Sequence, residues 1–233
     1  MQVSLHQRTD VALNHRIAAA WASFSSHRKE LTNKRYPLKC RLRLFDATVT
    51  ATVLYSCESW TLKLDQQRRL RKVQRCMLRM IIGSKRHTKP PSQSSSSDSE
   101  IGIADVDDPD PVMEPWPEYL KRTARLTEEK LQDVGLNEWA DQWRRRQWKY
   151  AGKLCSQQEH KWAFKLLKWE PFIHSAKHGS RAQSRPKKRW REDIDSFLQS
   201  LNSEYTMEKL AKNKKEWHRL ESEFLAWCRI SLR

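Results

Sequence analysis

The sequence has little glycine and few β-branched apolar residues, and it is rich in tryptophan. Only 5 of its 233 residues are glycine, whereas 11 are tryptophan. Sheet proteins need strands enriched in Val and Ile and tight turns that often place glycine at positive φ. Hydrophobic residues make up 38% of the chain and charged residues 31%, so any core must be modest. We therefore predict an all-α fold whose helices pack through tryptophan anchors.

Signals for membranes or export are also missing. The sequence has no run of about 18 apolar residues, the length needed to cross a bilayer. Its beginning lacks the short apolar core and small-residue cleavage site of a secretory signal peptide. These absences predict an intracellular protein with no membrane partner.

The five cysteines include no Cys-x-x-Cys pair, which predicts reduced and mostly buried thiols. One alternative is a zinc site, since Cys155, His160, His174 and His178 lie at intervals similar to those of a zinc finger. Zinc normally takes four Cys or His ligands from closely spaced pairs, and this set would supply only one thiolate. We therefore predict no metal and no other cofactor.

No recognisable catalytic group is present either. Polymerases hold two metal ions with paired carboxylates, and the only Asp-Asp pair, Asp107-Asp108, lies in an acidic stretch rich in Ser and Pro. A metal-dependent nuclease remains an alternative, in which Asp110 would join Glu128 and Lys130. Such ligands need rigid placement on neighbouring elements. We predict that this chain is not an enzyme.

Positive charge, by contrast, is abundant. The chain has 45 Lys and Arg against 28 Asp and Glu, a net charge of +17 and a pI of about 9.9. Residues 1–88 and 114–233 are basic, whereas residues 89–113 are acidic, Ser- and Pro-rich and too polar to fold. We predict two small helical modules joined by a disordered acidic linker, with nucleic acid as the partner.

In the first module, Ile17, Trp21 and Phe24 follow helical spacing, while the β-branched run at 48–55 is compatible with a helix or a strand. A clearer helix follows, with Asp65 as its expected N-cap and Gly83 as its end. Its apolar stripe consists of Leu70, Val73, Met77 and Ile81. The basic residues on its other faces are expected to contact the phosphate backbone: Arg68, Arg71, Lys72, Arg75 and Arg79.

The second module shows tryptophans interleaved with basic residues. Leu136, Trp139, Trp143, Tyr150 and Leu154 are expected to share one helical face. Arg144, Arg145 and Lys149 lie beside them and are expected to hold nucleic acid; stacking of bases on the aromatic rings is an alternative to packing.

Three stretches complete this module. Trp162, Leu166 and Trp169 form a further predicted stripe. A long one consists of Leu210, Trp217, Leu220, Phe224 and Trp227, with Ile230. Pro186 is expected near a helix N-terminus, where Lys187, Lys188 and Arg189 would bind phosphate. The same basic run is also compatible with a nuclear localisation signal, so the nucleus is one expected location of this intracellular protein.

Three motifs resemble those of one protein family. The segment Tyr55-Ser-Cys-Glu58-Ser-Trp60, followed by the Leu/Gln/Arg helix, resembles the Tyr-Gly-x-Glu-x-Trp region after the palm of non-LTR retrotransposon reverse transcriptases. Trp148-Lys-Tyr-Ala-Gly152 is similar to the family's Trp-x-x-x-Gly-His segment, and Arg185-Pro-Lys-Lys-Arg-Trp190 with Asp193 to its Arg-Pro-x-x-Arg-Trp-x-x-Asp element. Ser56, Lys153 and Ser184 depart from the family pattern.

The resemblance implies a thumb-like helical module that grips template-primer behind a polymerase palm. The palm of such an RNA-directed DNA polymerase would lie upstream of Met1, or on a separate polymerase-bearing chain. The expectation is therefore a truncated, non-catalytic fragment that binds RNA, DNA or hybrid duplex. The alternative is a folded transposon relic with no activity or with a protein-binding role.

Overall fold

The computed structural model describes residues 5–89, 112–156, 161–168 and 188–231, and it is all-α, as predicted. A two-residue antiparallel ladder pairs Thr88 with Met113 and Lys89 with Val112. The elements, in chain order, are α1 (Leu5–Ser26), α2 (Arg28–Thr32), α3 (Leu38–Phe45), η1 (Asp46–Thr50), α4 (Ala51–Val53), η2 (Cys57–Ser59), α5 (Leu64–Ile82), β1 (Thr88–Lys89), β2 (Val112–Met113), α6 (Trp116–Val134), α7 (Trp139–Cys155), α8 (Trp162–Lys168), α9 (Glu192–Leu201), α10 (Met207–Leu210) and α11 (Lys214–Ser231). The segment 90–111, predicted to be disordered, lies outside the described residues.

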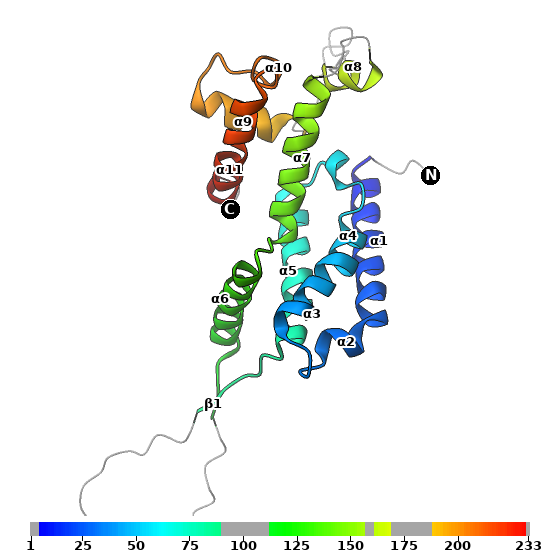
Figure 1. Cartoon of the computed structure of the whole chain (residues 1–233), viewed down its shortest axis with the longest axis vertical. Coiled ribbons are helices and arrows are strands. Elements are labelled where there is room, and N and C mark those ends of the chain that lie inside the picture. Colours follow the sequence, from blue (N-terminus) through cyan, green and yellow to red (C-terminus); the bar gives the residue numbers. More distant parts are fainter. Residues whose placement is uncertain (1–4, 90–111, 157–160, 169–187, 232–233) are drawn as a thin grey trace, which may run out of the picture.

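Two hydrophobic cores lie at opposite ends of the molecule. In Figure 1, α1 to α5 and α6 form the lower part, α8 to α11 form the upper part, and α7 runs from one to the other. The lower core contains residues from α1, α3 and α5 together with Trp139 and Trp143 of α7. The upper core contains Trp148 and Ala151 of the same helix with α9, α10 and α11. The buried residues thus divide within α7, whereas the charge pattern divides the chain at residues 89–113.

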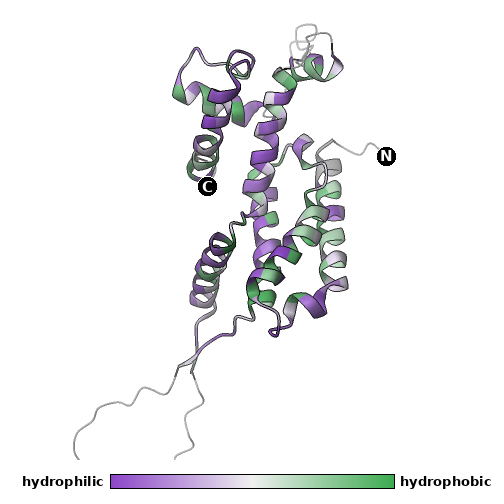
Figure 2. Ribbon diagram, viewed as in Figure 1, coloured by the Kyte–Doolittle hydropathy of each residue, from purple (hydrophilic) through white to green (hydrophobic). Residues whose placement is uncertain are grey.

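Hydropathy follows this arrangement. Figure 2 shows hydrophobic residues gathered where α1, α3, α4 and α5 face one another, while α6 and α7 are largely hydrophilic on the side in view. Phe24, Phe45 and Leu70 are almost fully buried there. Phe45 stacks on Trp139 with ring centroids 5.8 Å apart, and the indole Nε1 of Trp139 donates to Thr50 Oγ1 at 2.8 Å. Trp139 of α7 therefore packs inside a core made mostly by residues of the first module.

The ambiguous run at 48–55 is helical as far as Val53, and Leu54 and Tyr55 lie in the turn that follows. It continues α3 through the π-helical turn η1 into α4, and the hydroxyls of Thr48 and Thr52 donate to the carbonyls four residues earlier. The β-branched residues Val49 and Val53 are buried on one face of this helical segment. Tertiary packing therefore overrides their preference for strands.

Two expected helix starts are wrong, and one helix end is confirmed. Helix α5 begins at Leu64, and the backbone N–H of Lys63 donates to the Gln66 side chain at 2.9 Å, so Asp65 is not the N-cap. Gly83 ends α5 with φ of 75°, as predicted. Helix α9 begins at Glu192, so Lys188 and Arg189 precede it rather than form its first turn.

The stripe predicted on α8 is also wrong. Trp162 is 77% exposed and Leu166 is 66% exposed, whereas Phe164 is buried and Leu167 packs against the upper core. Trp169 lies outside the described residues. The C-terminal stripe is confirmed in Trp217, Leu220 and Phe224 of α11, which pack against α9. It does not form one helix, because Leu210 lies on the separate helix α10, and Ile230 is 76% exposed.

Candidate nucleic-acid interface

Two arginines predicted to contact phosphates instead join α5 to α7. Arg75 donates from Nε and Nη2 to Glu138 Oε1 at 3.0 and 2.8 Å, and the Nε of Arg71 lies 3.4 Å from Glu138 Oε2. Glu138 immediately precedes α7, and its side chain is only 13% exposed. Both guanidinium groups therefore neutralise a carboxylate within the fold.

Arg144 is buried, so the prediction that it contacts nucleic acid is wrong. The residue is 2% exposed, pairs with Asp193 and lies over the Trp143 ring at 4.4 Å from its centroid. The ammonium of Lys188 reaches the same Asp193 oxygen at 2.7 Å. The Asp of the Trp-x-x-Asp motif thus holds α9 against α7.

The same pattern recurs along α7. Arg145 pairs with Glu221 at 3.0 Å, and Arg229 pairs with Asp141 at 2.6 Å. Glu138, Asp141, Asp193 and Glu221, here called the interhelical acids, have side chains exposed by 16% or less. Each acid is neutralised by at least one basic residue from another element, so these pairs connect the helices.

The remaining basic residues on α5 and α7 form two solvent-facing rows. On α5 the exposed face carries Arg68, whose side chain is 61% exposed and 3.8 Å from Asp65, with Arg69, Lys72 and the half-buried Arg79; we call this the α5 ridge. On α7, helical spacing brings Arg146, Lys149 and Lys153 to one exposed face, the α7 ridge. Among the described residues, no acidic side chain forms an ion pair with Arg69, Lys72, Lys149 or Lys153. Arg189 is exposed, and Lys187 lies outside the described residues.

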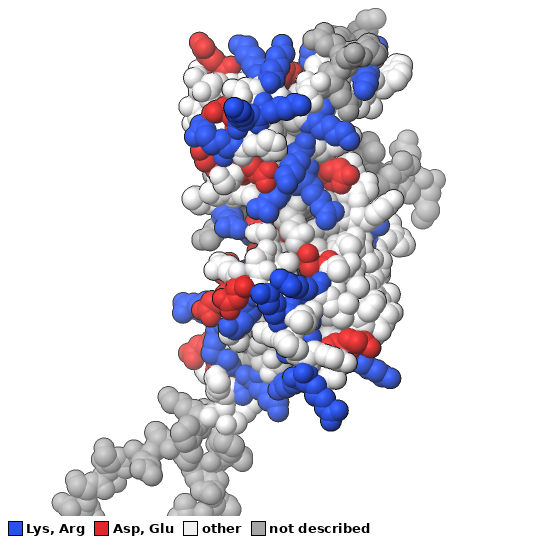
Figure 3. Space-filling model, in the orientation of Figure 1, with Lys and Arg blue, Asp and Glu red and all other residues white. Residues whose placement is uncertain are grey.

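Figure 3 shows how this charge is distributed over one face. Lys and Arg side chains gather over α7, α6 and the upper helices, with acidic side chains between them. The part of this face formed by α1 and α4 is largely uncharged. On this face, positive charge therefore gathers over α6, α7 and the upper helices rather than over α1 and α4.

The three motifs of the sequence analysis contact one another at the side of α7. The indole Nε1 of Trp190 donates to the Glu58 carbonyl at 2.7 Å, and the Trp190 ring meets the Tyr150 ring edge-on with centroids 6.0 Å apart. Ser56, which occupies the glycine position of the family motif, has φ of 54°. A Cβ on Gly152 would lie 2.5 Å from the Trp217 indole, so the packing requires glycine there.

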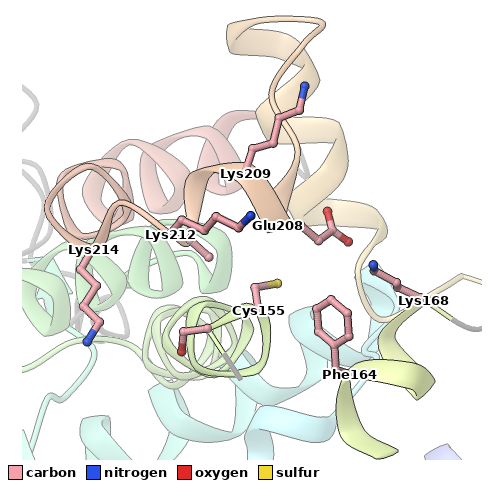
Figure 4. Close-up of a pocket in the computed structure, with 9 residues that line it drawn as sticks. Cys155, Phe164, Lys168, Glu208, Lys209, Lys212 and Lys214 are labelled. Carbon is pink, nitrogen blue, oxygen red and sulfur yellow. The ribbon is translucent and has the colours of Figure 1, made fainter. Parts of the chain in front are cut away.

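A cavity of about 380 Å³ lies at the upper end of α7 (Figure 4). Cys155 and Phe164 form its floor, and Glu208 and Lys168 direct their charged ends toward the space above them. Glu208 pairs with Arg191 at 3.3 Å. Burial raises the pKa of the Cys155 thiol to about 12, so this cysteine is protonated at neutral pH.

The alternative metal sites are not assembled within the described residues. Of the zinc set only Cys155 is described, because His160, His174 and His178 lie outside. Asp110 of the nuclease set also lies outside, while Glu128 and Glu129 are exposed on α6 and Lys130 pairs with Asp133 at 3.0 Å. Across the part of the chain that the structure describes, no three His, Cys, Asp or Glu side chains converge to hold a metal.

Comparisons with known proteins give no relative: no family model, no curated protein and no solved structure matches the chain. Within the described ranges, no helix is both long and apolar enough to cross a bilayer.

Proposed function

We propose that this chain is a non-catalytic nucleic-acid-binding fragment that resembles the region after the palm of a non-LTR retrotransposon reverse transcriptase. Its α5 and α7 ridges hold the sugar-phosphate backbone of a template-primer duplex. Location in the nucleus and cooperation with a separate polymerase-bearing chain stay predictions.

The observation that carries this proposal is the division of the basic residues into two groups. The interhelical acids are already neutralised by Arg71, Arg75, Arg144 and the other basic residues that form ion pairs with them. Arg69, Lys72, Lys149 and Lys153 of the ridges therefore add positive charge on two exposed helical faces, beyond the charge that the interhelical ion pairs use. Rows of exposed Lys and Arg bind phosphates and release counterions, which gives affinity without base specificity.

The contacts among the three motifs support the resemblance to reverse transcriptases. Trp190 binds the turn that contains Glu58, Asp193 binds α7, and Gly152 leaves room for Trp217. Residues that lie far apart in the sequence but match one family's pattern thus pack against the same group of helices.

The test is duplex binding measured across salt concentrations. Fluorescence anisotropy with a labelled RNA–DNA hybrid and a DNA duplex should give tight binding at low salt, with log K falling steeply against log salt. One variant replaces exposed ridge residues by alanine: Arg69, Lys72, Lys149 and Lys153. A control variant removes the same charge from the corner around α2: Arg28, Lys29, Arg35 and Lys39. All eight residues are exposed, so both variants should fold.

The ridge variant should show a salt slope shallower by about 2 to 4, because each lost phosphate contact removes about 0.9 from the slope. The corner variant should lose much less. Equal losses in the two variants would show that only net charge matters, and the ridge assignment would fail. Absence of binding by the wild-type chain would favour a relic or a protein-binding role instead.

A further inference from the structure

Tyr55 is an exposed aromatic residue on a fixed turn. It is 66% exposed, although it lies directly after the buried Leu54 and only two residues before the buried Cys57. An exposed tyrosine between buried neighbours presents its ring to solvent at a defined position. The ring is not part of either core.

Contacts from both sides hold the backbone of this turn. Arg146 binds the Leu54 carbonyl at 2.8 Å, and Trp190 binds the Glu58 carbonyl at 2.7 Å. Ser56 has φ of 54°, a left-handed conformation that costs a non-glycine residue about 1 kcal/mol. The surrounding packing therefore determines the orientation of the turn, and Tyr55 needs little ordering when it binds a ligand.

Basic and aromatic side chains lie near this turn. The Arg16 guanidinium lies over one face of the Tyr55 ring, 5.1 Å from its centroid. Arg146 is exposed on the α7 ridge and donates to the Leu54 carbonyl of the same turn, and Tyr150 follows one helical turn later, edge-on to Trp190 at 6.0 Å. Two arginines and two tyrosines thus lie on the elements that meet at this turn.

A groove of about 540 Å³ continues this surface between α1 and the η1–α4 helix. Tyr55 and Arg16 line it at one side, and hydroxyl or imidazole side chains supply further hydrogen-bonding groups. The lining residues are Arg16, Ser23, His27, Ala47, Thr48, Ala51, Thr52 and Tyr55. None of these lining residues is acidic, so they do not repel a phosphate that enters the groove.

We propose that Tyr55 is a stacking platform for an unpaired base, so that the surface formed by Arg16, Tyr55, Arg146 and Tyr150 binds single-stranded nucleic acid. This inference rests on the proposed function and assigns the single strand to a site separate from the α5 ridge. Single-strand sites combine a basic groove with aromatic rings on which bases stack without sequence preference. The arginines here supply phosphate contacts, and the ring of Tyr55 supplies the base contact.

The test compares a labelled oligothymidylate of about 20 nucleotides with a blunt duplex of similar length at about 50 mM salt. Replacing Tyr55 by Ala should weaken single-strand binding by about fivefold or more, while duplex binding stays the same. Tyr55→Phe should keep the affinity, because stacking needs the ring and not the hydroxyl. Tyr36→Ala is the matched control, since Tyr36 is also an exposed tyrosine, at 52%, but lies on the turn before α3.

Photo-crosslinking with a 5-iodouracil oligonucleotide gives a second measurement, and the crosslinked peptide should contain Tyr55. Unchanged single-strand affinity in Tyr55→Ala would overturn the inference while duplex binding, and with it the proposed function, stands. A crosslink at the exposed Trp162 that depends on that residue and not on Tyr55 would also overturn it. If the wild-type chain binds neither probe at low salt, the proposed function and this inference both fail.

Discussion

Replacing Gly152 by alanine should destabilise the upper core. The new Cβ would lie 2.5 Å from Trp217 Nε1 and 2.9 Å from Trp217 Cδ1, closer than atoms can approach. Trp217 is 4% exposed and stacks on Trp148 with ring centroids 4.0 Å apart. Each indole N–H also donates to the backbone carbonyl of the other residue, from Trp148 to Trp217 at 3.0 Å and from Trp217 to Trp148 at 3.2 Å. Trp217 therefore cannot move without disturbing both rings.

The expected change in the free energy of unfolding combines one stabilising effect with two destabilising effects. Alanine favours the helix over glycine by about 1 kcal/mol. Overpacking costs about 1 to 3 kcal/mol, and loss of the buried indole hydrogen bond costs about 1 to 3 kcal/mol. We expect a net loss of about 1 to 5 kcal/mol in the free energy of unfolding. Urea denaturation followed by circular dichroism at the helical signal measures it.

A second background makes the test specific for the contact with Trp217. In a Trp217→Leu variant the pyrrole ring that meets the new Cβ is gone. Gly152→Ala should then be neutral or stabilising, because only the helix preference remains. If Gly152→Ala is as stable as the wild type, or equally harmful in both backgrounds, steric exclusion by Trp217 is not the reason for glycine at this position.

Three further predictions concern the turn, the interhelical acids and the base of the β ladder. Ser56→Gly should stabilise the chain by up to about 1 kcal/mol in urea denaturation, because relief of the left-handed strain exceeds the added entropy of the unfolded chain. Asp193→Asn should cost about 3 to 5 kcal/mol, because it leaves the 2% exposed Arg144 without its carboxylate. Hydrogen bonds from Arg122 hold the pKa of Glu114 down at about 2 from 4.5, so its contribution to stability is present above pH 4.5 and is lost as the pH falls through about 2. Glu114→Gln should therefore flatten the acid limb of a plot of unfolding midpoint against pH.

Each of these has a matched comparison. Ser59→Gly removes a similar side chain from the 3₁₀ turn η2, where φ need not be positive, and should not stabilise. Glu223→Gln breaks an exposed pair with Arg219 and should change stability by less than about 1 kcal/mol. A loss on Glu223→Gln as large as that on Asp193→Asn would mean that burial does not set the value of these pairs. A pH profile unchanged by Glu114→Gln would assign the acid limb to other carboxylates.

Local patterns in the sequence were enough to predict most helices and much of the core. Leu70, Met77 and Ile81 are buried on one face of α5, and Gly83 ends it, because spacing along a helix and the need for positive φ are local properties. The prediction of which face of α8 is buried was wrong, because this seven-residue helix has apolar residues on two faces. Only tertiary contacts determine that Phe164 is buried and Trp162 is exposed.

The partners of the basic residues could not be predicted in the same way. Arg75 and Glu138 are 63 residues apart, and Arg144 and Asp193 are 49 apart. The sequence shows that α5 carries many arginines and one nearby acid, Asp65, and so predicts that the whole array is available to phosphates. Once the chain folds, the acid that matters for Arg75 comes from the start of another helix. The exposed Tyr55, conversely, lies in a motif whose other aromatic residue, Trp60, packs against the core, and the pattern does not distinguish them.

Helix α7 explains why charge and packing divide the chain differently. The charge pattern reports where apolar residues are too sparse to fold, which marks residues 89–113. The cores report which side chains exclude water together. Trp139 and Trp143 complete the lower core, while Trp148 begins the upper one five residues later. Helix α7, whose tryptophans are buried in both cores, thus joins the two cores, and the ion pairs of the interhelical acids add contacts from α5, α9 and α11. The α5 and α7 ridges therefore belong to one packed framework, and a duplex held by both would meet them at a fixed separation.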